Sequence, residues 1–78
     1  MESARFTFRG RIACDSFVEF ARHRARRLSL TIEFGACDET SATVSITGQE
    51  ALVDAFEMAC SLGPYDCLVL DIDRLALR

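Results

Sequence analysis

Two hydrophobic periods follow one another along this chain in an order that restricts the possible folds. In residues 5–12, 30–34, 43–47 and 68–73, apolar and polar side chains alternate with a period of two, as they do in strands with one buried face. Residues 16–28 and 49–61 repeat their apolar residues every three or four positions, which is typical of helices with one apolar stripe. The predicted order is strand, helix, strand, strand, helix, strand.

Local signals predict where the helices begin and end. Ser16 and Glu19 form a capping-box pattern, in which each side chain can bind the backbone amide of the other. Thr47 and Glu50 repeat this pattern before the second helix. Gly63-Pro64 should end that helix, because proline cannot continue it.

These elements predict a single α+β domain over residues 1–78, with its core within residues 5–73. One apolar face on each element favours a single sheet with both helices on the same side. Right-handed crossovers then give a four-stranded antiparallel sheet of order 4-1-3-2. In the last strand we expect Leu68, Leu70 and Ile72 to be buried, whereas Asp71 and Asp73 should pair with arginines across the open sheet face.

Charge and hydropathy restrict the partners. The formal net charge is −3, which gives no reason to expect an anionic membrane or nucleic acid. An RNA-recognition role is disfavoured further, since the open sheet face offers no aromatic on its first or third strand. The N-terminal sequence has no apolar run of the kind found in signal peptides, and no segment reaches membrane-spanning length. We therefore expect a cytoplasmic protein without cofactor or metal.

The four cysteines do not form a metal-binding or C-x-x-C pattern. In a cytoplasmic protein their thiols should be reduced and should pack as small hydrophobic groups. Cys14 and Cys37 offer an alternative, a redox pair or soft-metal site, because one follows the first strand and the other the second. Cys60 and Cys67 are expected around the end of the second helix.

The first helix carries a dense basic run. One interpretation is a solvated helix face, and the alternative is a surface formed by Arg22, Arg24 and Arg26 that docks an acidic partner. His23, the only histidine, has no neighbour in a recognised metal or nucleophile pattern.

The chain resembles the acylphosphatase family over residues 5–73. The resemblance depends on Gly10-Arg11-Ile12, Phe17, Ala25-Arg26-Arg27-Leu28 and Leu30-Thr31 in the first half, and on Val44-x-Ile46-x-Gly48, Ala51-Leu52, Phe56 and Gly63-Pro64 in the second. It implies a ferredoxin-like fold with the element order derived above. It also implies a phosphate site, in which a loop before the first helix and an arginine at its start bind the phosphate while an asparagine after the second strand orients the attacking water.

At these positions the sequence departs from the family. The loop reads Ala13-Cys14-Asp15-Ser16, without glycine and with an acid where phosphate would bind. The family's arginine position is Val18, and its asparagine position falls near Ala36 in a chain that contains no asparagine.

We therefore expect a domain that lacks hydrolase activity and acts as a binding or interaction module for a protein or a small anionic ligand. A first alternative is an acylphosphatase with relocated groups, in which Arg11 would contact the phosphate. A second is a small-ligand regulatory module. The chain is expected to be a monomer or a weak homodimer that pairs through a sheet edge.

Overall fold

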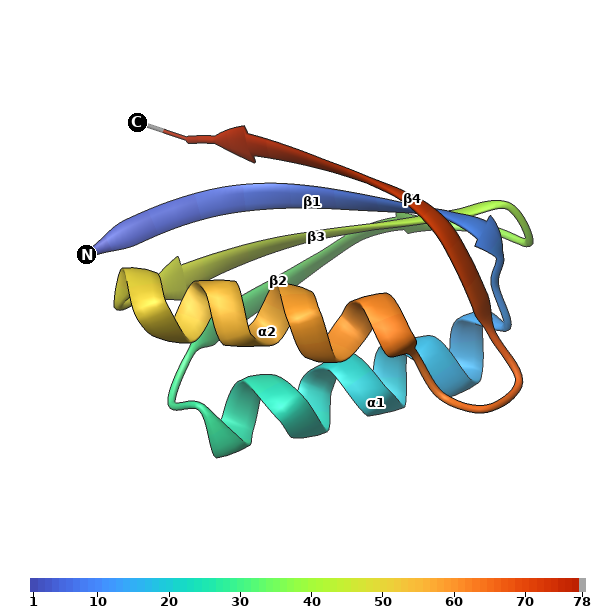
Figure 1. Ribbon diagram of the computed structural model, residues 1–78, viewed down its shortest axis with the longest axis horizontal. Coiled ribbons are helices and arrows are strands. Elements are labelled where there is room, and N and C mark those ends of the chain that lie inside the picture. Colours follow the sequence, from blue (N-terminus) through green and yellow to red (C-terminus); the bar gives the residue numbers. More distant parts are fainter. Residues whose placement is uncertain (78) are drawn as a thin grey trace.

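A computed structural model describes residues 1–77 and has the predicted element order. The elements are β1 (Glu2–Arg11), α1 (Cys14–Arg27), β2 (Thr31–Cys37), β3 (Ser41–Gly48), α2 (Glu50–Leu62) and β4 (Leu68–Ala76). The strands form one antiparallel sheet of order β2-β3-β1-β4, and both helices cover the same face (Figure 1). Read from the other edge, this is the order 4-1-3-2, so the predicted ferredoxin-like fold is confirmed. Within residues 1–77, neither helix is long and apolar enough to span a membrane.

The core lies between the helices and the two central strands. Phe6 and Phe8 of β1 are fully buried, as are Phe17 of α1 and Phe56 of α2. Their rings are in mutual contact, with centroids 5.2 Å apart for Phe8 and Phe17 and 6.0 Å apart for Phe6 and Phe56. The alternation in β1 therefore meets both helical stripes in one aromatic cluster, as the sequence predicts.

The edge strand β4 departs from the predicted alternation. In the pairing of β4 with β1, Asp71 pairs with Arg9 and Val69 pairs with Gly10. Leu70 lies between them without a partner, so it is the extra residue of a β-bulge. The prediction that Leu68 and Leu70 are buried is wrong, because they are 52% and 73% exposed. The extra residue shifts the alternation by one, and Val69 packs against the core together with Ile72.

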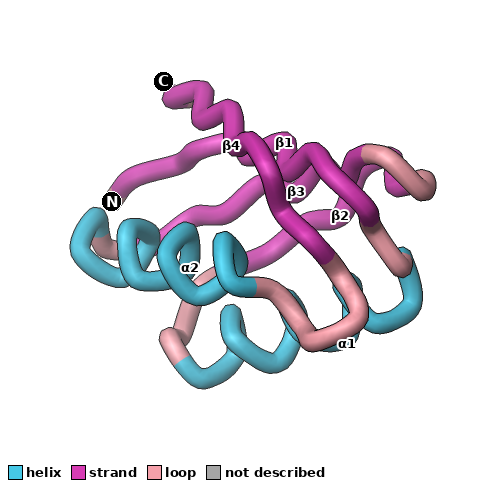
Figure 2. The backbone as a smooth tube through the Cα atoms, turned by 45° about the vertical axis from the view of Figure 1, so that its right-hand side comes forward, coloured by secondary structure: helices cyan, strands magenta, loops and turns pink. Residues whose placement is uncertain are grey.

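Gly10 permits the close approach of β1 and β4 at this bulge. Its φ of +153° is rarely adopted by other residues, and a Cβ atom there would collide with the carbonyl oxygen of Leu68. Beyond the bulge, the Gly10 and Ile12 amides donate to the carbonyl oxygens of Thr40 and Glu39, at 3.0 and 2.9 Å. These bonds hold the β2–β3 turn against the end of β1, directly before α1 begins (Figure 2).

The predicted ion pairs on the open sheet face are present. The Arg9 guanidinium lies 2.5 Å from Asp73 and 3.7 Å from Asp71 across the β1–β4 pair. All three side chains are about half exposed or more, so these pairs contribute little to stability.

Arg74 makes a second cluster of ion pairs on the helix-facing side of β4. Its guanidinium binds Asp54 and Glu57 of α2 at 2.7 and 2.9 Å, and Glu2 of β1 at 3.0 Å. It also lies over the Phe6 ring, 5.3 Å from the centroid. One side chain therefore connects α2 to two strands and covers the edge of the core.

Neither predicted capping box forms. The N-cap residues are Ala13 for α1 and Gln49 for α2, and neither makes a side-chain capping bond. Ser16 is already helical, because α1 begins at once after a short turn, and it bonds to Asp66 instead. Thr47 lies within β3, as the alternation over residues 43–47 predicts, and its hydroxyl hydrogen-bonds to the Ser3 hydroxyl of β1 instead of capping α2.

Candidate functional site

The turn that the resemblance assigns to phosphate is short and is bonded to the α2–β4 loop. Only Ile12 and Ala13 separate β1 from α1. The Ala13 amide donates to the Cys67 sulfur at 3.3 Å, so it already has an acceptor. In the first turn of α1, the Ser16 hydroxyl donates to the Asp66 carboxylate at 2.7 Å. The predicted segment Ala13-Cys14-Asp15-Ser16 is therefore connected to the α2–β4 loop.

A disulfide joins Cys14, the first residue of α1, to Cys37, the last residue of β2, with their Cα atoms 6.1 Å apart. The prediction of reduced thiols is thus wrong for these two residues. The hydrogen bonds that hold the β2–β3 turn against the end of β1 bring them together, and the disulfide joins the two cysteines that the alternative prediction placed side by side. Cys60 and Cys67 are free, and burial raises the pKa of the Cys60 thiol to about 12.

The three other positions singled out from the resemblance lie on three different elements. Val18 is half-buried on α1, and Ala36 is exposed near the end of β2. Arg11 is exposed at the end of β1. Val18 and Ala36 thus carry apolar side chains, and Arg11 is the last residue of β1, directly before the turn.

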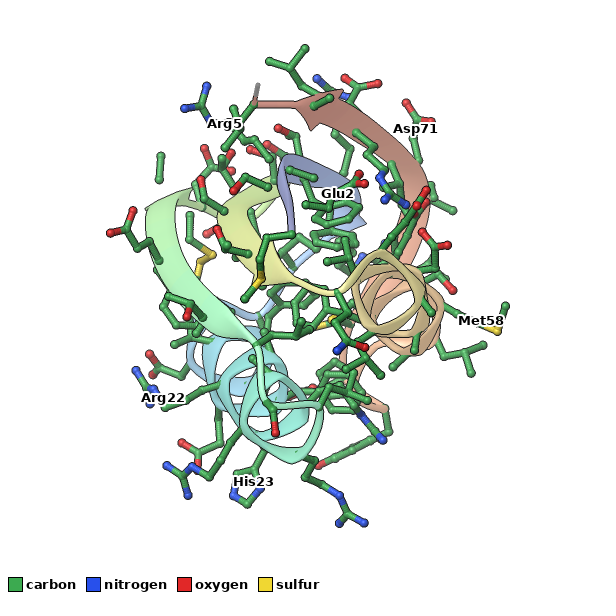
Figure 3. All side chains as sticks on the ribbon, turned by 90° about the vertical axis from the view of Figure 1, so that its left-hand side faces the viewer. Glu2, Arg5, Arg22, His23, Met58 and Asp71 are labelled. Atoms are coloured by element: carbon green, nitrogen blue, oxygen red, sulfur yellow. A yellow bond between two sulfur atoms is a disulfide. The ribbon has the colours of Figure 1, made fainter. Side chains whose placement is uncertain are left out.

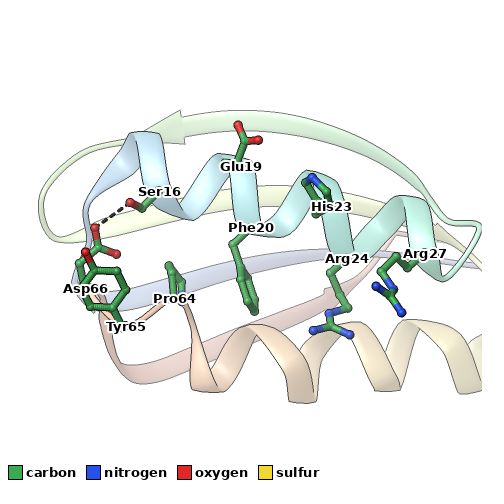
Figure 4. A pocket seen from close by; sticks show the side chains of 9 residues that line it. All are labelled: Ser16, Glu19, Phe20, His23, Arg24, Arg27, Pro64, Tyr65 and Asp66. Atoms are coloured by element: carbon green, nitrogen blue, oxygen red, sulfur yellow. Dashed lines mark hydrogen bonds between the residues drawn. The ribbon is translucent and has the colours of Figure 1, made fainter.

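A groove with a volume of about 420 Å³ lies between α1 and the α2–β4 loop (Figure 4). We call it the α1 groove. Its lining residues are Ser16, Glu19, Phe20, His23, Arg24, Arg27, Pro64, Tyr65 and Asp66.

The α1 groove is polarised along its length. Arg24 and Arg27 lie toward the end of α1, and in Figure 4 both point toward α2. The Arg24 guanidinium lies 5.7 Å from the centre of the Phe20 ring, near the middle of the groove. Tyr65 is fully exposed at the opposite end, beside Asp66. The groove thus combines a cationic end, an apolar middle and an acidic end.

The predicted basic surface does not form one face. Arg22 points to the other side of α1, where its guanidinium lies 5.5 Å from the centre of the Phe34 ring of β2. Arg26 is exposed and does not line the groove, so Arg24 alone of the three predicted residues does so. In Figure 3, Arg22 lies on the β2 side of α1, whereas His23 projects from the helix away from the sheet.

Sequence reasoning missed the aromatic members of the groove. Phe20 and Arg24 are four residues apart, which places them on one helix face, and this spacing could have identified half of the groove. Tyr65 comes from the α2–β4 loop, and only the tertiary structure places it beside α1.

Comparison with known proteins gives a structural match alone. No protein-family model matches the chain, and neither does any curated protein sequence. Among solved structures, an acylphosphatase from Bacillus subtilis matches with a TM-score of 0.90 and 23% identity, covering 100% of this chain and 87% of that one. An acylphosphatase from Coxiella burnetii matches with a TM-score of 0.89 and 17% identity, covering 99% and 81%. At these identities the matches establish the fold.

Proposed function

Starting from the acylphosphatase fold of this chain, we propose that it is a non-catalytic binding module that holds an acidic peptide segment of a partner protein in the α1 groove. The observation that carries the proposal is the position of Arg24 and Arg27 beside Phe20 in one open groove.

The residues around the β1–α1 turn support the absence of hydrolysis. Val18 and Ala36 stand where the resemblance implies an arginine and an asparagine, and neither side chain can bind phosphate or orient water. The Ala13 amide is bonded to Cys67, and Asp15 adds a negative charge to the first helical turn. An entering phosphate would have to displace one contact and approach a carboxylate.

The dimensions of the α1 groove favour a short extended segment. From Ser16 to Arg27 the helix rises by about 16 Å, which matches about five residues of extended chain. An acidic side chain can bind the guanidinium groups of Arg24 and Arg27, and an apolar one can pack on Phe20 and Pro64. Glu19 and Asp66 then favour a basic or amide group at the other end of the segment.

A peptide titration tests this proposal. The probe is a capped pentapeptide with a central phenylalanine and two glutamates at one end, used together with its reversed sequence, and the readout is the amide NMR spectrum of the protein. We expect shifts concentrated on α1 residues 16–27 and on residues 64–66, with weaker binding at higher salt.

The chain offers a matched control for the charges. The double variant Arg24→Gln/Arg27→Gln should bind at least tenfold more weakly, whereas Arg22→Gln/Arg26→Gln removes the same charge from the same helix and should bind as the wild type does. An equal loss of affinity in both variants would show that binding depends only on the net charge of the helix. That result would contradict binding in the α1 groove.

An activity assay tests separately the proposal that the domain lacks hydrolase activity. Incubation with benzoyl phosphate should give hydrolysis no faster than the buffer background. Turnover that disappears in Arg11→Ala would establish the alternative, an acylphosphatase with relocated groups, and would overturn this part of the proposal.

A further inference from the structure

The disulfide between Cys14 and Cys37 has no role in the proposed peptide binding, yet its surroundings are those of a reactive bond. Both residues are partly exposed rather than enclosed in the core. Cys14 lies at the outer edge of the hydrophobic cluster, and Cys37 ends the edge strand β2 at an irregular position of the β2–β3 pairing. A dissolved thiol can therefore approach the bond without global unfolding.

The two sulfurs are unequal as leaving groups. Cys14 is the first residue of α1, where the free amides and the helix dipole stabilise a thiolate. Cys37 ends a strand and has no such stabilisation. The neighbouring Asp38 carboxylate is engaged within its own turn, because it accepts hydrogen bonds from the Thr40 and Ser41 amides at 2.8 and 3.0 Å. Asp15, the other nearby acid, is exposed to solvent.

From this geometry we infer that the Cys14–Cys37 disulfide is a thiol-exchange site for low-molecular-weight thiols of the glutathione class. The attacking thiolate bonds to the Cys37 sulfur, the Cys14–Cys37 bond breaks, and its electron pair goes to Cys14, which takes up a proton. A second thiolate then attacks the small-molecule sulfur of the mixed disulfide. This step releases Cys37 as a thiol and forms one molecule of oxidised thiol, so two small thiols are oxidised for each protein disulfide reduced.

Reduction would release a connection between two distant parts of the fold. The disulfide joins the start of α1 to the end of β2 across 23 positions of sequence. Once reduced, the Cys14 thiol has an acceptor in the Asp38 carbonyl oxygen, 3.4 Å away. The reduced state therefore keeps a local contact in place of the covalent bond, and the pair can close again.

The test uses the wild-type chain and glutathione as the probe. Native protein is incubated with reduced glutathione over a tenfold range of concentration, samples are quenched with acid, free thiols are blocked, and peptides are mapped by mass spectrometry. The rate of disulfide loss should rise at least tenfold over this range, because one or both attacking thiolates come from glutathione. A transient glutathione adduct should lie on Cys37, and oxidised glutathione should restore the bond.

Two results would overturn the inference. A rate that does not depend on glutathione and equals the rate of global unfolding, measured by hydrogen exchange, would make the disulfide purely structural. An adduct on Cys14 would refute the assigned leaving group. As a second measurement, Cys14→Ser incubated with oxidised glutathione should form a persistent glutathione adduct on Cys37 and release one reduced glutathione, because this variant lacks the thiol that would displace the adduct. Absence of the adduct would also count against the site.

Discussion

Replacing Arg74 with methionine removes the cation that connects α2 to β1 and β4 and keeps an unbranched apolar side chain over Phe6. Of its three carboxylate partners, Asp54 is 58% exposed, while Glu2 and Glu57 are 27% and 32% exposed. Taking about 0.5 kcal/mol for the exposed pair and about 1 kcal/mol for each of the others gives a loss of roughly 2–3 kcal/mol.

A loss of this size should be visible in thermal and urea unfolding. We expect the midpoint temperature to fall by roughly 10–20 °C, as a domain of this size loses about 4–8 °C per kcal/mol. Added salt should narrow the difference between Arg74→Met and the wild type, because the three remaining carboxylates repel one another less when screened. Arg74→Lys keeps the charge without the planar fork and should lose about half as much.

The pH dependence follows from the raised pKa of Arg74, whose main cause is the hydrogen bond to Asp54. A raised pKa stabilises the fold at every pH below the range in which arginine loses its proton in the unfolded chain. The difference between wild type and Arg74→Met should therefore stay constant from about pH 6 to about pH 9. A destabilisation below about 0.5 kcal/mol, or one that salt leaves unchanged, would refute this account of the cluster.

Three further predictions concern the turn region and the core. The variant Cys14→Ser/Cys37→Ser should lose about 3 kcal/mol of stability in urea under non-reducing conditions, since the bond spans 23 positions, and should equal the reduced wild type. Gly10→Ala should cost about 1–3 kcal/mol through its backbone conformation alone, and more through collision with Leu68; urea unfolding within about 0.5 kcal/mol of the wild type would contradict this. Iodoacetamide at about pH 8 should leave Cys60 unmodified in the native protein, because its pKa is about 12, and labelling at the denatured rate would show that it is not buried.

Much of the fold could be predicted because local pattern and global packing agree. The alternation of Phe6 and Phe8 and the helical spacing around Phe17 and Phe56 point to the same core, which the structure contains. The pattern failed at Leu70, where a β-bulge inserts one residue. A bulge depends on how two strands pair, and alternation within one strand does not report it.

The candidate site was less accessible to prediction, because it combines segments that are distant in sequence. Counting along the helix could relate Phe20 to Arg24, but not to Tyr65 of the α2–β4 loop. The bond between Cys14 and Cys37 likewise depends on how the β2–β3 turn packs against the end of β1. The order of the strands therefore suggested the Cys14–Cys37 pair, whereas the side of the groove formed by the α2–β4 loop could not be predicted from spacing.

The neighbouring positions of the first and last strands have a practical consequence for protein engineering. Ala4 pairs with Ala76, the Leu77 amide donates to the Ser3 carbonyl oxygen at 2.9 Å, and both ends of the described chain lie on the same side of the molecule (Figure 1). A compact unit whose ends nearly meet can be spliced into a surface loop of an unrelated host without stretching either partner. Short flexible joints should suffice for such a graft, and new ends could be opened at the exposed β2–β3 turn to make a circular permutant.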